Sequence, residues 1–124
     1  MIGLKIDGID INSIADIPAG TGLGSSSAFT VALLNALYVY QNKTISKKQL
    51  AEEASEIEID LLGEPIGKQD QYASAYGGLN RINFLKNGDV EVNKIELSEN
   101  EKTNLQNNLI LMYYGNQRDA SDIL

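Results

Sequence analysis

The chain has 124 residues, enough for one domain at most, and 43% of them are hydrophobic, an ordinary share for a packed protein. It contains neither cysteine nor histidine, which excludes disulfides, thiolate catalysis, Ser-His-Asp triads and the usual zinc sites. The net charge of −7 and the lack of a long basic run argue against a nucleic-acid partner or an anionic membrane. No apolar stretch reaches the roughly 18 residues of a transmembrane helix, so we expect a cytoplasmic setting.

The first third of the chain predicts strands, then a loop, then a central helix. Residues 4–17 alternate loosely and predict one or two strands that turn at Gly8. A glycine-rich loop follows over 18–24, and a helix is predicted over 25–41 because apolar residues recur there at helical spacing. The main stripe of this helix is Phe29, Ala32, Leu33, Ala36, Leu37 and Tyr40, widened by Val31, Leu34 and Tyr38.

A second helix is predicted to begin at Ser46, where Ser46 and Gln49 fit a capping box. Gly63 and then Pro65 are expected to end it. Its predicted core stripe is Leu50, Ala54, Ile57 and Leu61.

The next segments predict a short helix and a hairpin. The helix covers 69–76 and ends at the glycine pair 77–78. Residues 79–85 and 90–97 are expected to pair across the Asn-Gly turn at 87–88.

The last part of the chain predicts a polar helix and a buried strand. Ser98 and Glu101 form a capping box that starts the helix. Residues 109–113 are mostly apolar and predict the strand.

The loop before the first predicted helix has the features of an anion-binding site. Free N–H groups at a helix N-terminus and the helix dipole both favour negative charge there. Glycines allow positive φ angles and a close approach to phosphate oxygens, and serines add hydroxyl groups. The P-loop pattern fails because no lysine follows these glycines, and the Rossmann pattern fails because position 25 is serine.

The loop sequence does match a third kind of phosphate loop. Residues 18–28, PAGTGLGSSSA, resemble the second motif of the GHMP kinases. Residues 64–71, EPIGKQDQ, resemble the segment of that family that carries the active-site aspartate. The longer stretch 51–80 most resembles the D-glycero-D-manno-heptose 7-phosphate kinase branch.

The resemblance implies that the loop binds ATP and Mg²⁺. Ser26 would be a magnesium ligand, with Ser25 the alternative, and Glu58 would be the second ligand. Glu53 and Asp60 also lie near the edge of the helical stripe, so helical spacing alone does not select Glu58. The residues implied in nucleotide binding are Gly20, Gly22, Leu23, Gly24, Ser25, Ser26 and Ser27.

The resemblance also implies an acceptor side. Asp70 would lie beside the acceptor hydroxyl, as general base or as electrostatic orienter. Lys68, Gln71 and Arg118 are candidates for contact with a sugar phosphate. Tyr114 stands where the family usually has threonine, a departure on the acceptor side.

The implied fold is α+β: part of the GHMP kinase fold, with a ribosomal protein S5 domain 2-like N-terminal domain in which a mixed sheet packs with helices. Residues 1–124 would form the central piece of such a kinase, mainly the N-terminal ATP-binding domain running towards the C-terminal domain. The family's N-terminal motif and its C-terminal glycine-rich motif are absent, so we expect an incomplete fold that exposes core surface and self-associates.

The function implied is ATP-dependent phosphoryl transfer to a heptose 7-phosphate-like sugar, with the isolated piece expected to be inactive. Two alternatives stay open. One is a noncatalytic nucleotide-phosphate binding or assembly module derived from such a kinase. The other is a GHMP kinase for a different sugar or alcohol.

Overall fold

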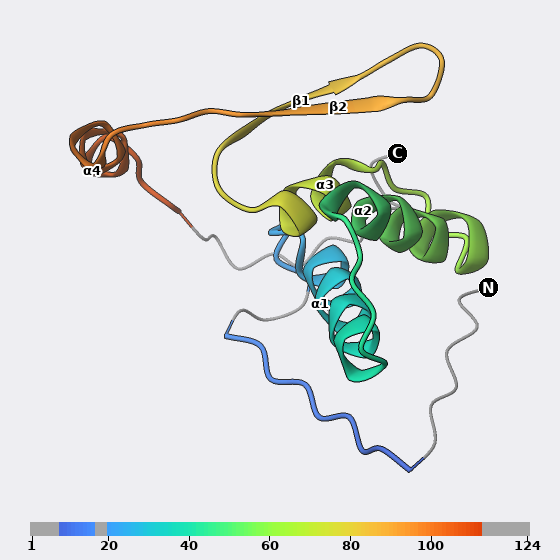
Figure 1. Ribbon diagram of the computed structural model, residues 1–124. Helices are drawn as coiled ribbons and strands as arrows, with labels where there is room; N and C mark the ends of the chain where they lie inside the picture. The colour runs from blue at the N-terminus through green and yellow to red at the C-terminus, as the bar shows by residue number, and fades with distance from the viewer. Residues whose placement is uncertain (1–7, 17–19, 113–124) are drawn as a thin grey trace.

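A computed structural model describes residues 8–16 and 20–112 of the chain (Figure 1). Three helices contact one another, and a hairpin packs against the third of them. A fourth helix lies apart, beyond the hairpin. The elements are α1 (Ser25–Tyr40), α2 (Lys47–Ser55), the π-helix η1 (Glu56–Leu61), α3 (Gln69–Tyr76), β1 (Asn80–Phe84), β2 (Val90–Lys94) and α4 (Glu99–Asn107). The α+β class is thus confirmed.

The core lies between α1, α2 and α3 and continues under the hairpin. One cluster of buried side chains comes from α1 and α2, and the other joins α2, α3 and β2. Ala75 of α3 packs against both, which makes α3 the element that connects them. The two clusters are Val31, Leu34, Tyr38, Leu50 and Ala54, and Ala51, Tyr72 and Val90.

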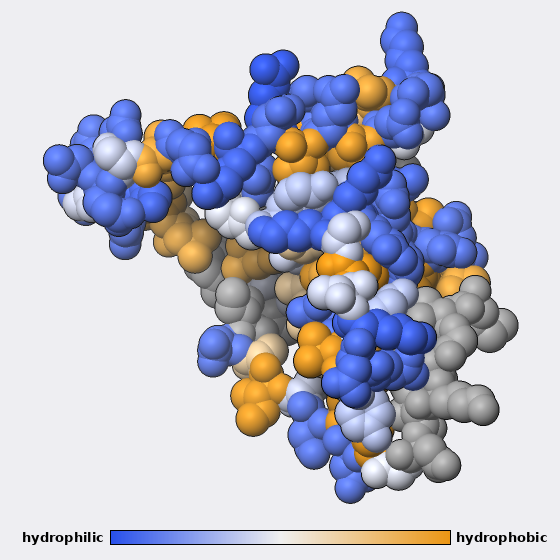
Figure 2. Space-filling view, in the orientation of Figure 1, coloured by the Kyte–Doolittle hydropathy of each residue, from blue (hydrophilic) through white to orange (hydrophobic). Residues whose placement is uncertain are grey.

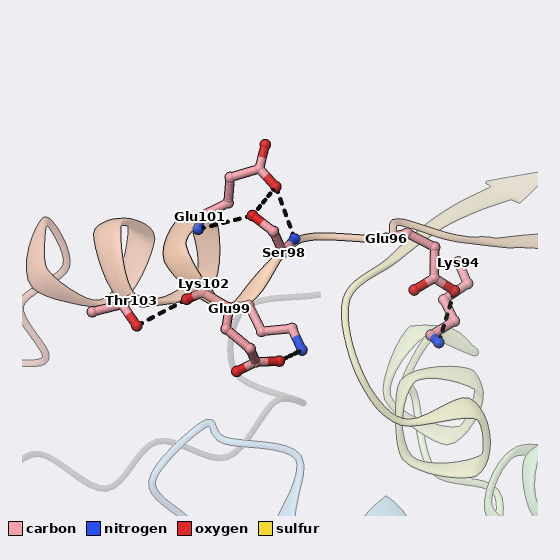
Figure 3. Close-up of polar contacts among 7 residues, drawn as sticks. All are labelled: Lys94, Glu96, Ser98, Glu99, Glu101, Lys102 and Thr103. Carbon is pink, nitrogen blue, oxygen red and sulfur yellow. Dashed lines mark hydrogen bonds and ion pairs between the residues drawn. The ribbon is translucent and has the colours of Figure 1, made fainter.

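Helix caps and the turn confirm several predictions. The Ser98 hydroxyl accepts from the Glu101 N–H at 3.3 Å, and Glu101 Oε2 accepts from the Ser98 N–H at 2.8 Å, a complete capping box (Figure 3). Ser46 caps α2, but the Gln49 side chain donates to Glu53, so only half of that box forms. The hairpin forms as predicted, with Phe84 opposite Val90.

The strands predicted over 4–17 and 109–113 do not form where the structure describes them, and residues 4–7, 17 and 113 lie outside the described residues. Residues 8–16 and 109–112 form no strand, and residues 109–112 are exposed. A strand needs a partner for its backbone N–H and C=O groups. Among the described residues the sheet contains β1 and β2 alone, so neither segment pairs with another strand.

The buried face of α1 differs from the predicted stripe. Its buried residues are Ser27, Val31, Leu34 and Tyr38, whereas Phe29 is 48% exposed. Four residues of the predicted stripe, Phe29, Ala32, Leu33 and Ala36, instead line a cavity of about 570 Å³ together with residues 11–16 and Leu23. Figure 2 shows orange apolar groups at the surface among blue polar ones. No helix of the described residues is long and apolar enough to cross a membrane.

Tyr38 connects α1 to α2 through a hydrogen bond at the edge of the core. Its hydroxyl donates to the Glu53 carboxylate at 2.8 and 2.9 Å. This hydrogen bond, with burial and the negative charge of Glu53, raises the pKa of the Tyr38 phenol. The protonated phenol is therefore the form that holds the two helices together.

We expect Tyr38→Phe to lower the free energy of unfolding by about 1 kcal/mol at neutral pH, because a hydrogen bond to a carboxylate is lost. Since the pKa is raised in the folded chain, this contribution is fully present below pH 10.0, the ordinary phenol value, and is lost as the pH rises through the raised value. Urea unfolding of both chains across this range measures the difference. Tyr40→Phe, at an exposed position, is the matched control; equal losses in the two variants would contradict the assignment.

Candidate functional site

The glycine-rich loop enters α1 through left-handed backbone. Gly20, Gly22 and Gly24 have φ angles of 74°, 72° and 69°. Gly24 is the N-cap of α1, and its carbonyl accepts from the Ala28 N–H at 2.9 Å. No side chain of the described chain caps this helix, and its first turn contains no acidic residue. The end of α1 therefore presents backbone N–H groups and the positive end of the helix dipole to an anion.

Three hydroxyl groups on one face of α1 converge on a single carboxylate. Ser26 donates to Glu58 Oε1 at 2.6 Å, Ser27 donates to Glu58 Oε2 at 2.8 Å, and Thr30 donates to Oε1 at 3.3 Å. Ser25 instead lines the apolar cavity on another side of α1. The structure therefore brings Ser26, rather than Ser25, together with Glu58.

Glu58 is a buried acceptor, with 1% of its surface exposed. Gln71 of α3 donates its Nε2 hydrogen to Glu58 Oε2, so four side-chain donors reach the carboxylate. A carboxylate offers about four lone-pair positions, and these donors fill them. Charge-assisted hydrogen bonds of this kind offset the cost of burying the charge.

The π-helix η1 explains why Glu58 lies inside. The Leu62 N–H bonds to the Ile57 carbonyl at 3.0 Å, five residues back rather than four. Each residue of such a turn rotates less around the axis than in an α-helix. Glu58 therefore moves from the edge of the stripe to its centre, while Leu61, a predicted core residue, is 66% exposed.

Asp70 lies directly against the loop. A Cβ atom built on Gly24 would lie 3.2 Å from both Cγ and Oδ2 of Asp70. Asp70 is an exposed residue in the first turn of α3, so the N-terminal ends of α1 and α3 meet at this contact. A carboxylate at a helix N-terminus is favoured by the dipole, and here two helix termini contribute.

The acceptor-side candidates fall in different places. Lys68 is exposed at the N-cap of α3. Gln71 is fully buried and contacts Glu58. Arg118 and Tyr114 lie outside the described residues. The structure thus brings Asp70, Gln71 and Glu58 to the loop and leaves Lys68 at the surface.

Thr30 was missed by the sequence reasoning, and a signal for it existed. It follows Ser26 by four residues and Ser27 by three, the spacings that place side chains on one face of a helix. The partnership of Gln71 with Glu58 had no comparable signal, because a buried and an exposed glutamine look alike in a sequence.

The hydroxyl oxygen of Ser26 and the carboxylate of Glu58 are suited to a magnesium ion that also binds phosphate groups. Hydroxyl and carboxylate oxygens are the hard ligands that Mg²⁺ prefers, and one or two carboxylates suffice when phosphates and water complete the octahedron. Within residues 8–16 and 20–112, no group of three or more acidic side chains is placed to hold a metal alone. Ser26 donates its own hydrogen to Glu58, which leaves the lone pairs of its oxygen available.

A loop of this kind, between one buried and one exposed carboxylate, is suited to a polyphosphate and a hard cation. Residues 1–78 match the profile described as GHMP kinases N terminal domain. That match covers more than half of the chain. The chain belongs to the GHMP kinase family.

Relatives of known activity agree with this membership. The chain is 34% identical over 113 residues to the D-glycero-alpha-D-manno-heptose 7-phosphate kinase of Campylobacter jejuni. This alignment covers 91% of this chain and 33% of that protein. The chain is 30% identical over 95 residues to the galactokinase of Thermotoga petrophila, an alignment that covers 77% of this chain and 27% of that protein. A mevalonate kinase of Methanothermobacter thermautotrophicus is 42% identical over 71 residues, an alignment that covers 57% of this chain and 23% of that protein.

A solved structure shows the same fold. The crystal structure of a D-glycero-D-manno-heptose 1-phosphate kinase from Bacteroides thetaiotaomicron matches with a TM-score of 0.65 and 42% identity. The match covers 67% of this chain and 27% of that one. The chain therefore spans a third or less of the length of these relatives.

Gly24→Ala tests the contact between the loop and Asp70. A non-glycine residue in left-handed backbone costs about 1–2 kcal/mol, and here the added methyl group must also displace Asp70. Gly63→Ala is the matched control, because Gly63 has a φ of 73° and open space around its Cβ position. We expect Gly24→Ala to lower the free energy of unfolding by more than Gly63→Ala in urea titrations. Equal losses would show that Asp70 does not press against the loop.

Proposed function

We propose that the loop binds the phosphates of ATP with Mg²⁺ and serves phosphoryl transfer to a hydroxyl of a sugar phosphate of the heptose 7-phosphate kind. The observation that supports this most is the meeting of three segments at one point. The loop at Gly24, the carboxylate of Asp70 and the Ser26–Glu58 pair come from α1, α3 and η1. Phosphoryl transfer depends mainly on such positioning and on electrostatic stabilisation.

In this proposal the loop backbone holds the β- and γ-phosphates. The N–H groups of residues 22–26 would bind the phosphate oxygens, with Gly20 and Ser27 forming the rest of the cradle. Ser26 would be a direct ligand of Mg²⁺, and Glu58, whose lone-pair positions are taken by four donors, would supply negative charge and orient the Ser26 oxygen. When bound, Mg²⁺ neutralises the charge that develops on the phosphate oxygens.

Asp70 is proposed to face the acceptor hydroxyl. Its carboxylate lies beside the loop and is exposed, so it is accessible to a second substrate. It can accept the hydroxyl proton or hold the hydroxyl in line with the phosphate, and a loose transition state needs only the second. Lys68 and Arg118 are proposed contacts for the sugar phosphate, where positive side chains complement its charge.

The heptose assignment rests on the relatives. Two of those that match are named heptose phosphate kinases, at 34% identity over 91% of this chain and 42% identity over 67% of it. The galactokinase match covers 77% of the chain at 30% identity and the mevalonate kinase match 57% at 42% identity, both less than the 91% covered by the heptose 7-phosphate kinase match. An S5 domain 2-like arrangement with a mixed sheet stays a proposal for the parent fold, to which the described residues contribute one antiparallel pair of strands. The ATP-binding domain is proposed to lie mainly in the N-terminal part of the chain, where the profile matches residues 1–78.

Isothermal titration of ATP into the 124-residue chain tests the loop assignment. We expect Mg²⁺ to strengthen ATP binding markedly, because Asp70 beside the loop otherwise opposes the polyphosphate charge. Ser26→Ala should weaken Mg·ATP binding about tenfold, or about 1.4 kcal/mol, and leave ATP binding without Mg²⁺ nearly unchanged. Ser74→Ala, whose hydroxyl makes no hydrogen bond to Glu58 in the described structure, is the control. No binding of Mg·ATP at all would sink the assignment.

Asp70→Asn tests the acceptor side in a catalytically active protein that carries these residues. We expect kcat for γ-phosphate transfer to fall about 100-fold or more while ATP affinity changes little, because the carboxylate acts on the acceptor. Asp60→Asn, at an exposed position of η1, controls for the loss of one negative charge. Near-normal turnover of Asp70→Asn would remove Asp70 from the mechanism.

A further inference from the structure

We propose that Gln71 is a positioning residue: through Glu58 it sets the Ser26 hydroxyl for the metal-bound nucleotide, and it fixes α3 against the phosphate loop. Thr30 assists by donating to Oε1, the carboxylate oxygen that Gln71 does not contact. This inference rests on the proposed function, because it assigns a role within the same site.

The hydrogen bonds to Glu58 are divided evenly between its two oxygens. Oε1 receives Ser26 and Thr30, and Oε2 receives Ser27 and Gln71. Three of the donors belong to α1, and Gln71 alone comes from α3. Without Gln71 the described donors to the carboxylate all come from α1, and one of the two contacts that set the position of Oε2 is lost. The Ser26 contact at 2.6 Å depends on the orientation of the same carboxylate.

Gln71 also acts on the placement of Asp70. The two residues are neighbours in the first turn of α3, and each meets the site at a different point. Asp70 lies against Gly24 on the outside, and Gln71 reaches Glu58 on the inside. A shift of α3 that loosened one contact would loosen the other. The interior hydrogen bond therefore keeps the proposed catalytic carboxylate beside the loop.

The other end of the Gln71 amide carries an energetic cost. Gln71 is fully buried, and its Oε1 atom has no hydrogen-bond partner among the described residues. The amide must turn its NH₂ group to the carboxylate, which leaves the carbonyl oxygen unsatisfied in the interior. A buried unpaired acceptor is unfavourable. An apolar side chain of the same size avoids that cost but cannot hold Glu58.

Gln71→Met therefore separates the two roles. The measurement is ATP affinity of the 124-residue chain with Mg²⁺ and with a chelator, by isothermal titration, beside urea unfolding. We expect the strengthening by Mg²⁺ to fall about tenfold, as when an outer-shell partner of a metal ligand is removed. ATP affinity without Mg²⁺ should be unchanged. Gln69→Met, at an exposed position of the same helix, should leave both affinities as they were.

A double-mutant cycle shows whether Gln71 acts through Ser26. In the Gln71→Met background, Ser26→Ala should reduce Mg·ATP affinity by much less than in the parent chain, because both changes break one linkage. Thr30→Val, which keeps the side-chain shape, should give a smaller loss in the same direction, consistent with its longer contact of 3.3 Å. This variant also carries the test if Gln71→Met does not fold.

The outcomes distinguish this inference from the function on which it rests. If Ser26→Ala weakens Mg·ATP binding but the Gln71 and Thr30 variants keep the full Mg²⁺ effect, the positioning role is wrong and the proposed function stands. Fully multiplicative losses in the cycle would also overturn it. If the parent chain does not bind Mg·ATP, both proposals fail together.

Discussion

The buried carboxylate of Glu58 is the constraint on which the rest of this structure depends. Removing a carboxylate from water costs several kcal/mol unless donors replace the lost hydration. Those donors come from α1 and α3, while Glu58 itself belongs to η1. The three elements cannot slide past one another without leaving a buried charge unpaired. The hydrogen bonds to Glu58 therefore fix the arrangement of these helices more strictly than apolar packing does, because losing them would leave a buried charge unpaired.

Apolar packing and the polar site occupy different faces of α1. Val31, Leu34 and Tyr38 pack towards α2, while the opposite face at Phe29 and Ala36 borders an open cavity. The hydroxyl groups begin one turn before the packed face, at the N-terminus of the helix. The same helix therefore anchors the core with its middle and presents its dipole to ligand with its end.

Local signals in the sequence were sufficient for most elements and for the loop. The box at Ser98, the Asn-Gly turn at 87–88 and the glycines before α1 each act within a few residues of themselves. The π-helix was missed because a change from four-residue to five-residue hydrogen bonds leaves no residue-type signature. The strand predictions for 4–17 and 109–113 failed over the described residues 8–16 and 109–112 for a different reason, because strand formation depends on a distant partner that periodicity does not reveal.

The charge of the site follows from this architecture. No lysine or arginine takes part in the described contacts that join the loop, Glu58, Gln71 and Asp70. The positive potential for a phosphate must then come from helix dipoles, backbone N–H groups and a metal ion. A chain of net charge −7 can hold such a site because these sources act over a few ångströms, whereas the charges of the surface are screened within about 8–10 Å. Glu58 contributes to the charge of the site in two ways. Its carboxylate supplies negative charge that attracts a cation, and its burial keeps that charge away from a bound phosphate.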